Sequence, residues 1–302
     1  MRALVTGGAG FVGTNLIKKL LNEGWEVASV DNYSTGYKEN EQEGCKYYRY
    51  SNADVRNNFW DLSTSDVCEV SCDCNIGTFD VIFHLAALAR IQPSMKEPVP
   101  PIQTNVMGTL NVLEYARKTN TQVIYSGSST KHAGIFKSPY AWSKHGGEEL
   151  CKLYSKIYDL NTTICRFYNV YGEHHIRSGD YATVVGIFER QFMNDEALTI
   201  TADGEQRRDF THIDDIVDAL FKCIGKDFRA EEFELGRGVN YSINEIANMY
   251  GEDYPKEYLP KRPGEYDMTL ADSSNAKEKL GWIPKKDIKD YITKWVEENK
   301  NV

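Results

Sequence analysis

Tyr140 and Lys144 are four residues apart in the segment PYAWSK, at the start of an expected helix over Pro139–Tyr158. Side chains at this spacing lie on one face of a helix. A tyrosine with an unperturbed pKa of about 10 is a poor base at neutral pH. A nearby ammonium group stabilises the phenolate, so we hypothesise that this pair takes a proton from a substrate hydroxyl. The alternative is a solvated helix face, on which such spacing is common.

A cluster of hydroxyl residues, SGSST at positions 126–130, follows the expected strand Gln122–Tyr125. Ligands of parallel α/β sheets bind at the carboxyl ends of the strands. We therefore expect one of these serines to hold the reacting oxygen, with an ordinary polar turn as the alternative.

Gly7, Gly10 and Gly13 stand at relative positions 1, 4 and 7, between the expected strand Met1–Thr6 and the expected helix Phe11–Leu21. Glycines at this spacing allow a tight turn, a close approach to a pyrophosphate and close packing of helix on strand. The pyrophosphate would then meet unpaired N–H groups at the start of the helix. The pattern predicts a dinucleotide site, against the alternative of a plain tight loop.

Asp31 directly follows the expected strand Glu26–Val30 and lies 18 residues after Gly13. A carboxylate here accepts hydrogen bonds from ribose hydroxyls and repels the additional phosphate of NADP. We therefore predict NAD as the cofactor, although a structural cap remains an alternative role for Asp31. For Asn32 and Ser34, turn formation and cofactor binding remain equally open.

Expected strands and helices alternate over the first 170 residues, which predicts right-handed βαβ units. The fold class is therefore α/β, a Rossmann-type doubly wound parallel sheet with a smaller C-terminal substrate-binding domain. The further expected elements are strands over Lys46–Tyr50, Phe79–His84 and Thr162–Phe167, a loop at Pro98, Pro100 and Pro101, and helices over Ile102–Lys118, Asp214–Ile224 and Ile288–Asn299. We place a NAD-binding domain at 1–170 and the smaller domain at 171–302, and we expect a helix near 212–226 to pack back on the first.

Composition narrows the class of protein. The 302 residues are 41% hydrophobic and 26% charged, which is typical of an ordinary globular chain and excludes disorder. No run of 18 apolar residues occurs, so no membrane span is expected. With 35 basic and 44 acidic residues the net charge is −9, which disfavours nucleic acid and anionic lipid as partners.

The seven cysteines are too few for a disulfide scaffold. The N-terminus lacks the cleavage site of a signal peptide, so we expect reduced thiols and a cytoplasmic protein. Cys68, Cys72 and Cys74 have no fourth ligand at suitable spacing, and we predict no metal site.

Several motifs occurring in order resemble those of extended short-chain dehydrogenases/reductases, and most closely the NAD-dependent nucleotide-sugar epimerases and dehydratases. The resemblance extends from Leu4 to about Trp282. Its motifs are Gly7–Gly13, Asp31–Gly36, His84–Ala87, Asn105, the hydroxyl cluster, Tyr140 with Lys144, and Arg166–Gly172.

The resemblance implies a set of site residues. Those of the NAD site are Gly7, Gly10, Phe11, Val12, Gly13, Asp31, Asn32, Ser34, Gly36, Asp54, Val55, Leu85, Ala86, Ala87, Ala89, Asn105, Tyr140, Lys144 and Tyr168. Ser128 is the implied catalytic hydroxyl, with Ser129 as the rival. Asn169, Arg208 and Arg262 would hold the nucleotide diphosphate, which suits guanidinium groups, and Glu265 would face the ribose.

The reaction implied first is epimerisation at C4 of a nucleotide-activated hexose through a 4-keto intermediate. The alternatives are 4,6-dehydration or decarboxylation. The dehydratases carry an Asp-Glu pair where Lys131 and His132 follow Thr130 here, in place of the usual Val-Tyr, and this favours the epimerase. A non-catalytic dinucleotide sensor is disfavoured because Tyr140 and Lys144 are both present.

The substrate is predicted to be a UDP-sugar. Thr269 stands where similar epimerases have a bulky tyrosine that excludes N-acetyl sugars, so UDP-N-acetylglucosamine should be accepted. UDP-glucose and UDP-glucuronate remain further candidates. We also expect a homodimer formed through the two long helices, with Trp142, Leu150, Leu153, Tyr154 and Ile157 facing the partner or packing on the sheet.

Overall fold

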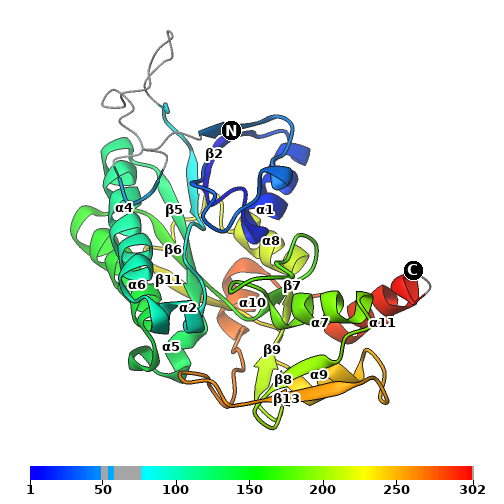
Figure 1. Cartoon of the computed structure of the whole chain (residues 1–302). Helices are drawn as coiled ribbons and strands as arrows, with labels where there is room; N and C mark the ends of the chain where they lie inside the picture. The colour runs from blue at the N-terminus through cyan, green and yellow to red at the C-terminus, as the bar shows by residue number, and fades with distance from the viewer. Residues whose placement is uncertain (49–53, 58–75, 301–302) are drawn as a thin grey trace, which may run out of the picture.

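A seven-stranded parallel sheet forms the centre of the protein, in the order β11-β6-β5-β4-β1-β2-β3 (Figure 1). The computed structural model describes residues 1–48, 54–57 and 76–300. The strands of this sheet are β1 Arg2–Thr6, β2 Glu26–Val30, β3 Cys45–Tyr48, β4 Val81–His84, β5 Gln122–Ser128, β6 Thr162–Phe167 and β11 Glu231–Leu235. The prediction of an α/β, doubly wound parallel sheet is confirmed.

Helices cover both faces of this sheet. On one side lie α1 Phe11–Asn22 and α8 Ile213–Lys222, and on the other α4 Gly108–Thr119 and α6 Pro139–Tyr158. Within β1, Ala3 and Val5 are buried against the first layer and Leu4 against the second, as the two-residue period of a strand requires. The central strands are therefore apolar on both faces.

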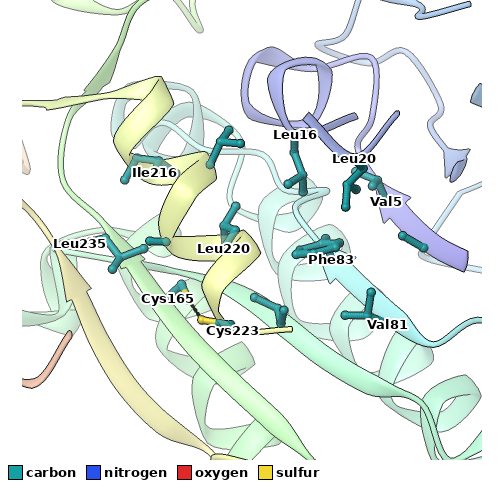
Figure 2. Packing of buried hydrophobic residues seen from close by; sticks show 14 of the residues in the cluster. Val5, Leu16, Leu20, Val81, Phe83, Cys165, Ile216, Leu220, Cys223 and Leu235 are labelled. Atoms are coloured by element: carbon teal, nitrogen blue, oxygen red, sulfur yellow. Dashed lines mark hydrogen bonds between the residues drawn. The ribbon is translucent and has the colours of Figure 1, made fainter. Parts of the chain in front are cut away.

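The core beneath α1 and α8 is shown in Figure 2. Leu16 and Leu20 of α1, Ile216 and Leu220 of α8 and Phe83 of β4 belong to one buried cluster. This packing brings α8, which follows residue 170 in the chain, back onto the sheet.

The start of α6 is fixed by local sequence. Ser138 caps the helix, and its Oγ accepts a hydrogen bond from Ala141 N at 3.1 Å. Pro139 occupies the first helical position, where no backbone N–H is required. Tyr140 consequently lies in the first turn of the helix, close to the end of the sheet.

The helix expected over Ile102–Lys118 differs from the prediction in where it starts and in its regularity. It begins earlier, with α3 Val99–Ile102, and passes through a π-helical turn over Gln103–Met107 before α4. Pro100 and Pro101, which were expected to form a loop, stand in the first turn of α3, where proline is tolerated.

Most elements after residue 170 pack round a core of their own beside the sheet (Figure 1). This core includes Phe188, Ile200, Ile246 and Ile292. The elements of this part are β7 Val170–Tyr171, α7 Val184–Met193, β8 Leu198–Thr201, β9 Arg207–Asp209, β10 Thr211–His212, β12 Asn240–Ser242, α9 Ile243–Asn248, β13 Lys256–Leu259 and α11 Ile288–Asn299. Helix α10 Ser274–Leu280 instead packs into the core beneath α1 and α8, through Ala276 and Leu280. Two short helices, α2 Ile91–Lys96 and α5 Thr130–Ala133, follow β4 and β5.

The surface of α6 that was expected to face a partner is partly exposed. Trp142, Leu153 and Ile157 have exposed fractions of 41%, 49% and 60%. Leu150 and Tyr154 instead pack against the core on the sheet side, so these two do not belong to an open surface.

Cys68, Cys72 and Cys74 lie outside the described residues. Within the described ranges, Cys165 and Cys223 are unpaired thiols whose Sγ atoms are 3.8 Å apart in the core (Figure 2). Residues 1–48, 54–57 and 76–300 contain no helix with the length and hydropathy of a membrane span. The same residues hold no cluster of His, Cys, Asp and Glu placed to bind a metal.

Candidate functional site

A cavity of about 500 Å³ lies at the carboxyl ends of the central strands, between the sheet and the C-terminal elements. The chain reverses its strand order between β1 and β4, and ligands bind at such switch points. Of the predicted site residues, the cavity is lined by Gly7, Gly10, Phe11, Val12, Gly13, Asp31, Asn32, Ser34, Asp54, Val55, Leu85, Ala86, Ala87, Ala89, Ser128, Tyr140, Lys144, Asn169, Arg208, Arg262, Glu265 and Thr269.

The glycine loop leaves no room for side chains at Gly7, Gly8 and Gly13. Gly7 has a φ of +76°, and a Cβ there would lie 2.9 Å from the Ala86 backbone. A Cβ at Gly13 would lie 2.2 Å from the carbonyl oxygen of Gly7. The first helical hydrogen bond of α1 runs from Thr14 N to Gly10 O at 3.0 Å, so the preceding N–H groups have no acceptor within the helix. These features fit a bound pyrophosphate.

Asp31 is placed at the rim of this loop. Its Oδ2 accepts from Ala9 N at 2.9 Å and its Oδ1 from Tyr33 N at 2.8 Å. Burial raises the pKa of its carboxyl, and these two hydrogen bonds oppose that shift. Each oxygen retains a second lone pair, so the carboxylate can still accept from a ribose.

Asp54 stands beside Asp31 in the cavity lining. Burial alone would raise its pKa, but hydrogen bonds from Arg56 hold the pKa of Asp54 below its usual value. Arg56 Nη2 lies 2.6 Å from Asp54 Oδ2, and Asn32 Nδ2 donates to the same oxygen at 2.8 Å. Arg56 is thereby paired with a carboxylate of the protein.

The hydroxyls of Tyr140 and Ser128 are in contact. Tyr140 Oη donates to Ser128 Oγ over 3.3 Å, and Thr130 Oγ1 donates to the same oxygen over 3.0 Å. Ser129 also lines the cavity, but its hydrogen bonds within the described residues are made by its backbone: its N–H donates to Phe167 O at 3.2 Å and its C=O accepts from His132 N at 3.2 Å. The geometry therefore favours Ser128 over Ser129 as the partner of the phenol.

Lys144 lies on the same helix face as Tyr140 and is buried. Its Nζ donates to Ser126 Oγ at 3.4 Å and lies 4.4 Å from the centroid of the Tyr125 ring. Burial lowers the pKa of Lys144 to about 8. The lysine is therefore close to the point of losing its charge at a mildly alkaline pH.

The phenol itself is not acidic in the protein alone. Burial raises the pKa of Tyr140, and the hydrogen bond to Ser128 and the charge of Arg90 only partly offset this. The predicted source of phenol acidity is Lys144 together with a positively charged nicotinamide. In the protein alone, Lys144 Nζ donates to Ser126 Oγ. In the protein alone, desolvation of the phenolate outweighs the neighbouring cations.

The opposite wall of the cavity carries the two predicted arginines. Burial lowers the pKa of Arg208, and Glu265 opposes this shift. The Arg208 guanidinium carbon lies 6.0 Å from the centroid of the Tyr266 ring. Arg262 is exposed at the cavity lining. Positive charge is thus concentrated where the surface is otherwise acidic.

Asn169 and Thr269 are joined on this wall. Asn169 Nδ2 donates to Asp209 O at 2.9 Å and to Thr269 Oγ1 at 3.3 Å. Asp209 N also donates to Thr269 Oγ1, at 3.3 Å. Thr269 is only 7% exposed, so a larger side chain there would have to enter the cavity or displace these contacts.

Three predicted cofactor residues do not reach the cavity lining. Gly36 packs against the backbone of the glycine loop. Asn105 is buried, and its Oδ1 accepts from Leu88 N at 2.9 Å. Tyr168 is buried and donates to Glu234 Oε2 at 2.9 Å. In this structure, these residues support the loops that carry the site.

Sequence reasoning missed Arg90, Ile91, Tyr181 and Tyr266, which all line the cavity. Arg90 and Ile91 directly follow the predicted loop at Leu85–Ala89, and Tyr266 directly follows Glu265, so proximity in sequence could have indicated them. Tyr181 had no such signal. The hydroxyl of Tyr266 is buried without a hydrogen-bond partner in the part of the chain that the structure describes.

The unusual Lys131-His132 pair belongs to an ion network beneath the site. Lys131 Nζ lies 3.2 Å from Glu232 Oε1, and His132 pairs with Glu234. Arg166 Nη2 lies 2.7 Å from Glu232 Oε2. The acidic residues of β11 therefore hold α5, and with it the end of the hydroxyl cluster. The same glutamates explain why the sequence did not predict the strand β11, because its sequence EEFEL lacks the apolar run of a buried strand.

Known proteins resemble this chain over its whole length. Residues 3–236 match the family model described as NAD dependent epimerase/dehydratase family. A putative UDP-glucose 4-epimerase of Methanocaldococcus jannaschii is 32% identical, covering 99% of this chain and 98% of its own. UDP-glucuronic acid decarboxylase 1 of Arabidopsis thaliana is 29% identical, covering 100% and 70%. The crystal structure of a Thermotoga maritima UDP-glucose 4-epimerase with UDP-glucose matches with a TM-score of 0.86, at 30% identity and 98% coverage of each chain.

Proposed function

Because the chain belongs to the NAD dependent epimerase/dehydratase family, we propose that it inverts C4 of a nucleotide-activated hexose through a transient 4-keto sugar. The observation that carries this proposal is the 3.3 Å contact between Tyr140 Oη and Ser128 Oγ. That contact lies in one cavity with the glycine loop at one end and Arg208 and Arg262 at the other.

NAD is the cofactor of this family, and the loop geometry fits it. We assign the pyrophosphate to the N–H groups at the start of α1 and a ribose to Asp31. Bound there, NAD would supply the hydride acceptor for oxidation at C4 and the hydride donor for reduction at the opposite face of the sugar. Residues 1–170, together with α8 and β11, would carry the cofactor, and the remaining residues the nucleotide sugar.

Tyr140 is assigned the proton transfer at the 4-hydroxyl. Its phenolate removes that proton when the hexose is oxidised, and its phenol returns it after reduction. Ser128 Oγ, held by Thr130, orients the reacting oxygen beside the phenol. The positive charge of Lys144 stabilises the phenolate form, which burial alone disfavours.

Arg208 and Arg262 are assigned to the diphosphate. Guanidinium groups bind phosphate oxygens in a fork geometry that fixes orientation. An epimerase must bind the diphosphate firmly and the hexose loosely. The 4-keto sugar has to rotate in the site and present its other face before it is reduced. Asn169 would assist at the diphosphate and Glu265 at the ribose.

The charges near the phenol favour epimerisation over 4,6-dehydration or decarboxylation. Water elimination needs a carboxylic acid next to the hexose. In the described part of the lining the acidic residues are Asp31, Asp54 and Glu265, of which the first two belong to the cofactor end. Lys131 and His132 occupy the position at which the dehydratases have acidic residues.

Product analysis tests the proposal. The purified protein is incubated with a panel of UDP- and dTDP-hexoses, and the products are separated by chromatography and identified by NMR. A C4 epimer supports the proposal. A 4-keto-6-deoxy sugar or a pentose would instead assign the dehydratase or the decarboxylase reaction.

Acceptance of N-acetyl sugars rests on Thr269. The small side chain leaves space beside Asn169 that a tyrosine would fill, so UDP-N-acetylglucosamine should be turned over. The same panel of sugars measures this.

The proposal of a homodimer is based on the exposed apolar residues of α6. Trp142, Leu153 and Ile157 form an apolar surface that a second copy would cover. Light scattering during size-exclusion chromatography should give twice the chain mass of 34.4 kDa. A monomeric mass at micromolar concentration would contradict the dimer.

A further inference from the structure

We propose that Arg90 binds a carboxylate on the sugar, so that the preferred substrate is a nucleotide-activated uronic acid. The inference rests on the proposed function, because it places the hexose beside Tyr140. It adds a specificity-determining residue that neither composition nor motif spacing indicated.

Arg90 lies where two cavities meet. It lines the main cavity together with Tyr140, and it also lines a second cavity of about 250 Å³. Tyr181 lines both cavities as well. A group on the hexose that points away from the diphosphate would therefore meet the guanidinium at this junction.

Among the described residues, Arg90 uses few of its hydrogen-bond donors. Its Nη1 donates to its neighbour Ala89 O at 2.9 Å. A guanidinium has five N–H donors in a planar fork that matches a carboxylate. The phenols of Tyr140 and Tyr181 line the main cavity with Arg90.

Two other cations of the lining have different neighbours. Arg208 Nη1 likewise donates to its neighbour Arg207 O at 2.9 Å, but Arg208 faces the carboxylate of Glu265, and Lys144 contacts Ser126 and the Tyr125 ring. Arg90 is half-buried at the cavity junction, and the described carboxylates of Glu97 and Asp180 line the second cavity rather than pair with it. A hexose hydroxyl gives a hydrogen bond but no charge, whereas a carboxylate gives both.

Contacts of α2 fix Arg90 near the reacting hydroxyl. Tyr140 N donates to Ser94 Oγ at 3.2 Å, which ties α2 to the start of α6. On its other side, Gln92 Nε2 donates to Pro263 O at 2.8 Å, next to Arg262. Arg90, as the residue before α2, is held on the hexose side of the diphosphate arginines.

The test compares UDP-glucuronate with UDP-glucose, which differ only in carboxylate against hydroxymethyl at C6. The wild-type protein is expected to prefer the acid sugar in kcat/KM. In Arg90→Gln the ratio of the two kcat/KM values should fall roughly 10- to 150-fold, which corresponds to the 1.5–3 kcal/mol of a hydrogen bond to a charged group. Arg90→Lys should recover part of the preference, because it restores charge without the fork.

Arg229→Gln is the matched control, because Arg229 is an exposed arginine that pairs with surface aspartates. It should leave the ratio unchanged. An equal loss on both sugars with a shifted pH profile would overturn the proposal, because Arg90 would then act through Tyr140. Loss of bound NAD in Arg90→Gln would overturn it too, by placing Arg90 at the cofactor.

Binding separates this inference from the proposed reaction. Titration calorimetry with the NAD-loaded protein measures both UDP-sugars whether or not turnover occurs. Tighter binding of UDP-glucuronate that Arg90→Gln abolishes would support Arg90 even if no C4 epimer forms. Equal binding of the two sugars to the wild-type protein would refute it even if both are epimerised.

Discussion

Replacing Tyr140 with phenylalanine tests the assigned proton transfer while disturbing little else. Among the described residues, the Tyr140 hydroxyl makes one hydrogen bond, over 3.3 Å to Ser128 Oγ. Losing such a bond costs about 0.5–1.5 kcal/mol of folding free energy. Removing a general acid–base group costs roughly 10²- to 10⁴-fold in rate. That loss corresponds to about 2.7–5.5 kcal/mol of activation free energy. Activity should therefore fall far more than stability.

The assay measures C4 epimer formation by chromatography, together with urea unfolding and the content of bound NAD. Tyr171→Phe provides a matched control, since Tyr171 is buried outside the cavity lining and its hydroxyl has no partner in the described structure. Its activity should equal that of the wild type. If Tyr140→Phe retains more than a tenth of the wild-type kcat with NAD bound, the assignment of Tyr140 is refuted.

Four further outcomes are expected. The kcat/KM of the wild type should fall above about pH 8, because Lys144 is charged below its pKa of about 8 and neutral above it. In Lys144→Arg this decrease should begin at a higher pH. If it begins at the same pH, Lys144 is excluded as its cause. Thr269→Tyr should lower the ratio of N-acetylated to plain sugar turnover roughly tenfold or more by filling the cavity, and an unchanged ratio would contradict this. Arg166→Met should lower the urea-derived stability by about 3–5 kcal/mol, because the buried Glu148, 2.8 Å from Arg166 Nη2, would keep only the more distant ammonium of Lys131 at 3.7 Å. A loss below about 1 kcal/mol would mean that the Arg166–Glu148 pair is weak. Gly13→Ala should abolish retention of NAD, measured by absorbance after denaturation, since its Cβ would lie 2.2 Å from a loop carbonyl.

Much of the fold followed from local patterns. The glycine loop, the alternation of apolar strands with amphipathic helices, and the Ser138–Pro139 start of α6 are local features, so their positions could be predicted. β11 could not be predicted in this way. Its half-buried glutamates are held by ion pairs with residues such as Arg166 and Lys131, which are distant in sequence.

The same contrast between local patterns and long-range contacts applies to the candidate site. Sequence alone placed Tyr140 and Lys144 on one helix face and Asp31 after the second strand, because backbone periodicity sets those relations. Only the tertiary structure decided that Ser128 rather than Ser129 contacts the phenol and that Arg90 enters the cavity. Contacts between segments far apart in the chain, and the desolvation that follows from burying them, determine which side chains meet and how acidic they are.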